Sequence, residues 1–65
     1  MPEYKNSDMR LAIEEYVRNP RYRELLYARF CLGETYEQIG EKVNYSPQHV
    51  KHICRTYRDL LISHL

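Results

Sequence analysis

Apolar residues recur along this chain at intervals of three and four positions, the spacing that places side chains on one face of an α-helix. The first such run holds Met9, Ile13, Tyr16 and Val17, and similar runs follow to the end of the chain. No stretch sustains the alternation of apolar and polar residues that is typical of a β-strand. The pattern therefore predicts an all-α protein.

Helix start and stop signals divide the pattern into four segments. Asn6 or Ser7 can cap the first helix, and Asn19-Pro20 supplies a cap and a first-turn proline for the second. Gly33 can take the left-handed conformation that ends a helix. The residues from Thr35 to Gln38 read as a capping box for the third helix.

The last helix begins at Ser46-Pro47, directly after Asn44, a residue type that tolerates positive φ and so suits a sharp turn. We expect a four-helix compact domain at 8–65, preceded by a flexible N-terminal lead at 1–7. The predicted helices cover about 8–17, 20–32, 36–43 and 47–63.

The third and fourth helices show a further constraint when positions are counted from Tyr36. The fourth, eighth, fifteenth and eighteenth residues are apolar, as two helices that cross steeply over a short turn require; they are Ile39, Val43, Val50 and Ile53. The fifth is Gly40. Glycine inside a helix costs about 1 kcal/mol relative to alanine, so its presence indicates a close backbone approach. This spacing predicts a helix-turn-helix.

The size and composition of the chain argue against several classes of function. A chain of 65 residues is near the lower limit for independent folding and leaves little room for a substrate cavity, so we expect no enzyme and no small-molecule substrate. Cys31 and Cys54, in a chain without an apolar export segment or membrane span, favour free thiols in the cytoplasm. His49, His52 and Cys54 are close in sequence, but no second ligand pair follows, so no metal or cofactor is expected.

The net charge of +1 gives no overall basic field, but the charges are unevenly distributed. Arginines dominate residues 18–29, glutamates dominate 34–42, and basic residues return in 46–65. Two basic segments flank an acidic one. A basic face is therefore compatible with a nearly neutral protein.

Residues 19–61 resemble region 4 of bacterial sigma factors and the related stand-alone, LuxR-like regulators. The matching features are, in order, Pro20, Arg23, Arg29-Phe30, Gly33, the run Thr35-Tyr36-Glu37-Gln38-Ile39-Gly40, and Ser46 with Val50-Lys51. Gly40 stands where alanine is more usual and Asn44 where the turn glycine is more usual. With no core-promoter segment before the domain, we do not expect sigma activity itself.

The resemblance implies a bacterial or phage-encoded transcriptional regulator that binds double-stranded DNA and inserts its last helix in the major groove. The exposed side chains at the start of that helix then read bases; they are Gln48, Lys51, His52 and Arg55. Backbone contacts are expected from the start of the third helix and from nearby polar residues, namely Thr35, Tyr36, Ser46, Arg21, Arg23 and Arg29. His49 receives no role.

Two questions about partners stay open at this stage. The C-terminal run LLISHL predicts a homodimer contact through Leu61, Ile62 and Leu65, while the alternative is that these residues close the core of one chain against the first helix. Region 4 also binds an RNA polymerase subunit, so the alternative function is a protein-interaction module that contacts RNA polymerase or another regulator. Neither alternative involves a membrane.

Overall fold

The computed structural model describes residues 6–63, which form helices and connecting turns without a strand. The helices are α1 (Asn6–Tyr16), α2 (Pro20–Phe30), α3 (Tyr36–Val43) and α4 (Pro47–Ser63). The predicted all-α class and its four helices are confirmed. Three ends differ: α1 begins two residues before the expected start, and α1 and α2 end one and two residues early. Residues 1–5 of the expected flexible lead lie outside the described residues.

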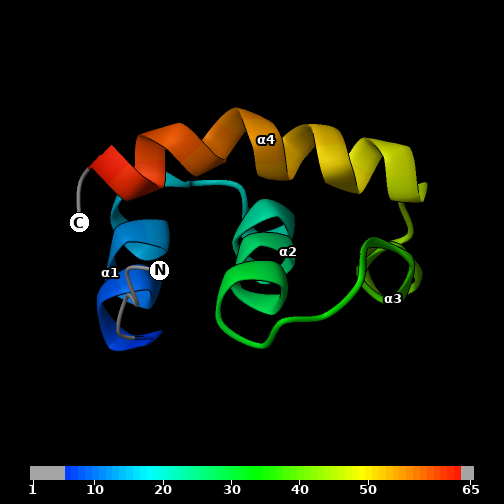
Figure 1. Ribbon diagram of the computed structural model, residues 1–65, viewed down its shortest axis with the longest axis horizontal. Helices are drawn as coiled ribbons and strands as arrows, with labels where there is room; N and C mark the ends of the chain where they lie inside the picture. Colours follow the sequence, from blue (N-terminus) through cyan, green and yellow to red (C-terminus); the bar gives the residue numbers. More distant parts are fainter. Residues whose placement is uncertain (1–5, 64–65) are drawn as a thin grey trace.

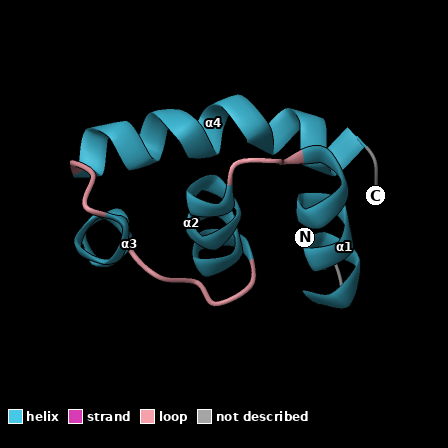
Figure 2. Cartoon of the chain, turned by 180° about the vertical axis from the view of Figure 1, so that it is seen from behind, coloured by secondary structure: helices cyan, strands magenta, loops and turns pink. Residues whose placement is uncertain are grey.

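The four helices are arranged so that α4 spans the other three. In Figure 1, α4 lies across the top of the molecule, with α1 beneath its C-terminal end, α2 beneath its middle and α3 beneath its N-terminal end. Contacts join α4 and α2 to each of the other helices, whereas α1 and α3 do not meet. Seen from behind in Figure 2, α3 is viewed almost end-on while α4 lies across the view, so the two cross steeply.

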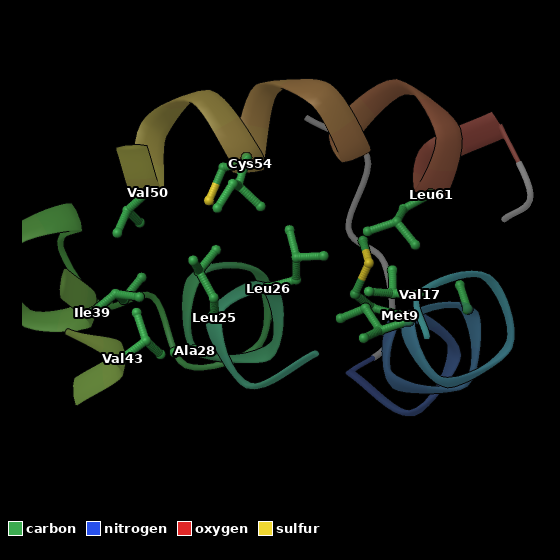
Figure 3. Packing of buried hydrophobic residues seen from close by; sticks show 13 residues of the cluster. Met9, Val17, Leu25, Leu26, Ala28, Ile39, Val43, Val50, Cys54 and Leu61 are labelled. Carbon is green, nitrogen blue, oxygen red and sulfur yellow. The ribbon is translucent and has the colours of Figure 1, made fainter. Parts of the chain in front are cut away.

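The core is a continuous apolar cluster between these helices (Figure 3). Val50 packs toward Ile39 at one end, and Leu61 points toward Met9 and Val17 at the other. Leu61 is 0% exposed, so it closes the core of the single chain and is not available to a second copy. Its burial favours the alternative, in which it packs against the first helix, over the expected dimer contact. Tyr16 was expected on the inner face of α1, but Ala12 is buried there and Tyr16 is 37% exposed.

A side-chain cap joins α1 to α2. Asn19 accepts hydrogen bonds from the backbone N–H groups of Arg21 and Tyr22, at 2.9 and 3.4 Å, and so begins α2 as predicted. Arg23 then reaches back from α2. Its Nε donates to the carbonyl oxygen of Val17, and its Nη2 donates to that of Glu14 at 2.6 Å. Because the last carbonyls of a helix lack intrahelical partners, Arg23 stabilises the C-terminal end of α1.

The connection from α2 to α3 depends on Gly33, which has a φ of +71°. The Glu34 N–H beyond it donates to the Ala28 carbonyl at 3.1 Å, which holds the chain against the end of α2. The Glu34 carboxylate forms an ion pair with Lys42 of α3 at 2.6 Å. The backbone hydrogen bond therefore holds the turn to α2, and the ion pair holds it to α3.

The turn between α3 and α4 covers residues 44–46. Asn44 has φ 62° and ψ 43°, the left-handed conformation expected for it, and its N–H donates to the Gly40 carbonyl. The Tyr45 N–H donates to the same carbonyl at 3.0 Å. A Cβ on Gly40 would lie 2.5 Å from the Tyr45 carbonyl oxygen. The predicted close approach exists; its shortest distance is to the turn, and the backbone nitrogen of Pro47, the first residue of α4, lies 3.7 Å away.

The two cysteines do not form a disulfide, in agreement with the sequence-based expectation. Burial raises the pKa of the Cys31 thiol, with Arg10 opposing the shift, and burial raises the pKa of the Cys54 thiol, with Arg29 opposing it. None of the helices in the described part of the chain has the length and apolar character needed to cross a bilayer.

Candidate nucleic-acid interface

The two faces of α4 have opposite chemistry. Its inner face carries Val50, Ile53 and Cys54, each no more than 3% exposed. The four expected base-reading residues are all exposed on the other side; they are Gln48, Lys51, His52 and Arg55. Their spacing of three and four positions places them in one row along the helix. The core therefore fixes the orientation of α4 and directs this row toward solvent.

Arg58 extends that row, although the sequence analysis did not single it out. It is exposed and lies three positions beyond Arg55, so it falls on the same face of α4. The ten steps along the helix from Gln48 to Arg58 span about 15 Å at the α-helical rise. The helical spacing alone was enough to find Arg58.

The start of α3 offers backbone donors of its own. The Thr35 hydroxyl accepts from the Gln38 N–H at 3.2 Å, and the Gln38 side chain accepts from the Thr35 N–H at 3.0 Å. The predicted capping box is confirmed, and it uses the hydroxyl of Thr35. It provides no acceptor for the N–H groups of Tyr36 and Glu37, which a helix does not satisfy internally. A helix N-terminus attracts anions, although the Glu37 carboxylate offsets part of that attraction.

The three arginines expected at the DNA backbone have different environments. Arg23 is held at the end of α1 by the two hydrogen bonds described above, so its guanidinium serves the fold and its expected DNA contact is not supported. Arg29 donates to the Glu34 carbonyl at 2.9 Å and lies 4.3 Å from the centroid of the Tyr36 ring. It fixes Tyr36 at the start of α3. Of the three arginines, only Arg21 is exposed.

Arg21 belongs to a cluster at the start of α4 that the sequence analysis did not foresee. Its guanidinium carbon lies 5.5 Å from the centroid of the Tyr45 ring. The His49 ring lies against the same tyrosine, with centroids 4.4 Å apart and planes tilted by 35°. The Tyr22 ring makes edge contacts with Tyr45 at 6.4 Å and with Tyr57 at 5.9 Å. These contacts tie the beginning of α2 to the turn and α4.

Ser46 acts as the cap of α4. Its hydroxyl accepts from the His49 N–H at 3.2 Å, and its carbonyl accepts from the Val50 N–H at 3.0 Å. The residue is exposed. Its hydroxyl proton remains available to an outside acceptor, so the cap is compatible with the expected backbone contact.

Other possible sites are weaker. Cys54 lies in the core while His49 and His52 are exposed, so these three residues do not converge. Among the residues described, no cluster of three or more His, Cys, Asp or Glu side chains is suited to a metal. A shallow groove between α1 and α2 is lined by Arg10, Ile13, Glu14, Arg23, Glu24 and Tyr27.

Because Leu61 is buried, fewer of the residues expected at a dimer contact are accessible to a second copy. Ile62 is half-buried, and Leu65 lies outside the described residues. Leu60, next to Leu61 on the outer side of α4, is 38% exposed. Within the described residues, the apolar surface that Leu60 and Ile62 offer at this end of α4 is that of one exposed and one half-buried side chain.

Comparison with known proteins adds no relative: the chain matches no protein-family model, and no curated protein sequence or solved structure is significantly similar to it.

Proposed function

We propose that this chain binds double-stranded DNA sequence-specifically through a helix-turn-helix formed by α3 and α4. The observation that supports the proposal most strongly is the division of α4 into a buried apolar face and an exposed row of hydrogen-bonding and basic side chains. In helix-turn-helix proteins the second helix enters the major groove with its N-terminal residues on base edges. The exposed polar row at the start of α4 supports such a docking.

The exposed row has the chemistry of direct base readout. A glutamine such as Gln48 can form two hydrogen bonds with adenine, and lysine or arginine at positions 51 and 55 can bind the O6 and N7 acceptors of guanine. Arg58 lies further along the helix and is placed to contact the backbone. Each good base contact contributes about 1–3 kcal/mol of discrimination.

Backbone contacts on either side of α4 would fix its position in the groove. The amides of Tyr36 and Glu37 at the start of α3, the Ser46 hydroxyl and the Arg21 guanidinium are the groups available. Phosphate contacts of this kind position a protein on DNA without carrying sequence information. The resemblance of residues 19–61 to sigma-factor region 4 supports the same docking, and a role as a small transcriptional regulator in a bacterial or phage-infected cytoplasm.

Selection of bound duplexes from a random DNA pool tests the proposal, and the selected sequence then serves as the probe for variants. The Gln48→Ala/Lys51→Ala double variant is expected to lose discrimination between this sequence and a scrambled one. Arg10→Ala is the matched control, because it also removes one positive charge but from α1, at the other end of the molecule. The free energy of unfolding should change by no more than about 0.5 kcal/mol in each variant, since the substituted side chains are exposed and the Arg10–Glu14 ion pair lies at the surface.

Salt dependence provides a second readout. Each neutralised phosphate lowers the slope of log K against log salt by about 0.9, so a DNA-binding protein weakens steeply as salt rises. If no duplex is enriched and binding to mixed duplexes is absent at low salt, the proposal is wrong and a protein-interaction module becomes the better interpretation.

A homodimer on two half-sites remains part of the proposal, because one helix-turn-helix makes few base contacts. The surface that remains for it on α4 includes Leu60 and Ile62. Half-site spacing in the selected sequences and sedimentation with and without DNA test this point. A single unrepeated site bound by one chain would contradict it.

A further inference from the structure

Arg29 links the C-terminal end of α2 to the start of α3. Its Nη1 donates to the Glu34 carbonyl at 2.9 Å, and its guanidinium carbon lies 4.3 Å from the centroid of the Tyr36 ring. Arg29 and Tyr36 are both half-buried. A planar guanidinium that makes both contacts at once limits the positions open to the ring.

The hydroxyl of the Tyr36 ring is accessible from outside the protein. It makes no hydrogen bond with the residues that the structure describes, and it is not among buried polar groups that lack a partner. Its oxygen therefore reaches the surface although the residue is half-buried. A phenol hydroxyl can donate a hydrogen bond to an acceptor such as a phosphate oxygen.

Cys54 shows on which side of α4 this pair lies. Burial raises the pKa of the Cys54 thiol and the positive charge of Arg29 opposes that rise, so the guanidinium lies near Cys54. Lys51 and Arg58 are three and four positions from Cys54, so they adjoin it on the surface of α4. Arg29, with Tyr36 beside it, is therefore on the side of α4 that carries these two exposed basic residues.

We infer that Arg29 is a positioning residue for DNA binding: it holds the Tyr36 ring so that the Tyr36 hydroxyl donates a hydrogen bond to one phosphate of the DNA backbone. The inference rests on the proposed DNA binding. It gives Arg29 an indirect role, whereas the sequence analysis expected Arg29 itself at the backbone.

The physical advantage of this arrangement is that the donor is held in place before DNA arrives. A side chain already in its bound position loses less conformational freedom on binding, so its contact contributes more affinity. Lys51 and Arg58 on the same side attract the phosphate backbone toward Tyr36. A direct contact between Arg29 and phosphate would not depend on the Tyr36 hydroxyl, so the two possibilities can be separated.

The test uses the selected duplex and four proteins: wild type, Tyr36→Phe, Arg29→Lys and the double variant. Tyr36→Phe removes the hydroxyl but keeps the ring, and it is expected to weaken binding about three- to tenfold. Arg29→Lys keeps the charge but loses the planar guanidinium, and it is expected to weaken binding to a similar extent. Because neither substitution changes a charge, the slope of log K against log salt should be the same in all four proteins.

The double variant measures whether Arg29 acts through Tyr36. Once Tyr36→Phe is in place, Arg29→Lys should weaken binding less than twofold, because the ring that it positions has lost its donor. Combined with Gln48→Ala, the same substitution should keep its full effect. Tyr22→Phe is the matched control and should bind as wild type does, since Tyr22 is also half-buried and makes ring contacts. Circular dichroism melts identify a temperature at which every variant is folded, and binding is measured there.

The outcomes separate this inference from the proposed function. If the wild type selects a duplex and Tyr36→Phe binds it equally well, the inference is overturned and DNA binding stands; this result does not depend on the folding of Arg29→Lys. Wild-type affinity in Arg29→Lys also overturns it, as do losses that multiply in the double variant, because Arg29 then acts independently of the hydroxyl. Failure of the wild type to bind any duplex overturns both.

Discussion

Gly40 is the residue on which the joint between α3 and α4 depends. It lies in a helix interior, where glycine is unfavourable, and its α-carbon faces the backbone of the following turn. The contact is made by the Tyr45 carbonyl, whose position is fixed by the left-handed Asn44. Because a carbonyl of the main chain cannot rotate away as a side chain does, a methyl group at position 40 has to displace the turn.

Gly40→Ala is expected to lower the free energy of unfolding by about 2 kcal/mol or more, because the overpacking cost exceeds the ~1 kcal/mol that alanine gains in helix propensity. Urea denaturation measures it. Gly33→Ala is the matched control: its Cβ would meet nothing within 4 Å, so only the strain of a φ of +71° applies, about 1 kcal/mol. Equal effects of the two substitutions would contradict the close approach.

Cys54 provides a chemical test of burial at the same scale. Its side chain is 3% exposed and burial raises its pKa, so little thiolate forms and little of it is accessible. We expect alkylation of Cys54 to be much slower than that of half-buried Cys31, and the rate at both thiols to increase as pH rises toward their raised pKa values. Mass spectrometry after timed alkylation distinguishes the two. Faster modification of Cys54 would show that the core opens near α4.

At the scale of helices, capping signals located most element boundaries. Asn19, Thr35 and Ser46 all cap as the sequence predicted, because a cap depends on atoms three residues away. The start of α1 and the ends of α1 and α2 were less well located. The C-terminal end of α1 is capped by Arg23, nine residues after Glu14, and no local pattern contains that contact.

Arg21 and Arg23 are expected to have opposite roles although they are two residues apart on α2. Arg23→Gln should lower the free energy of unfolding by about 1 kcal/mol, because the carbonyls of Glu14 and Val17 at the C-terminal end of α1 lose a charged donor while staying near water. It should leave the salt slope of DNA binding unchanged. Arg21→Gln should do the reverse, leaving stability unchanged and reducing the slope by about 0.9. Urea titration and binding isotherms measure both, and exchanged outcomes would contradict the assignment.

At the scale of the whole molecule, α4 acts as the common support for the other helices. It packs on α3 at its N-terminal end and on α1 at its C-terminal end, so the row of polar residues is held in place by the entire core. Leu61 is the contact that closes the core over α1. Loss of that contact should therefore affect the stability of the domain as a unit.

Leu61→Ala is expected to lower the free energy of unfolding by about 2–5 kcal/mol, a large part of the total for a small domain. Leu60→Ala is the matched control, since it removes the same atoms from a side chain that is 38% exposed. Its effect should be within about 0.5 kcal/mol. Thermal denaturation measures both at several protein concentrations, and a melting temperature of Leu61→Ala that recovered with concentration would restore Leu61 to a dimer contact.

The sequence by itself determined the helical class, the four elements, the glycine at the tight joint and the outward row on α4. These features depend on periodicity, caps and backbone freedom, which act over a few residues. Only the tertiary structure decided that Leu61 is buried, that Arg23 is used at the end of α1, and that Arg21 and His49 both lie against Tyr45. Those outcomes depend on contacts between helices, and helical spacing says which residues share a face but not which neighbouring helix that face meets.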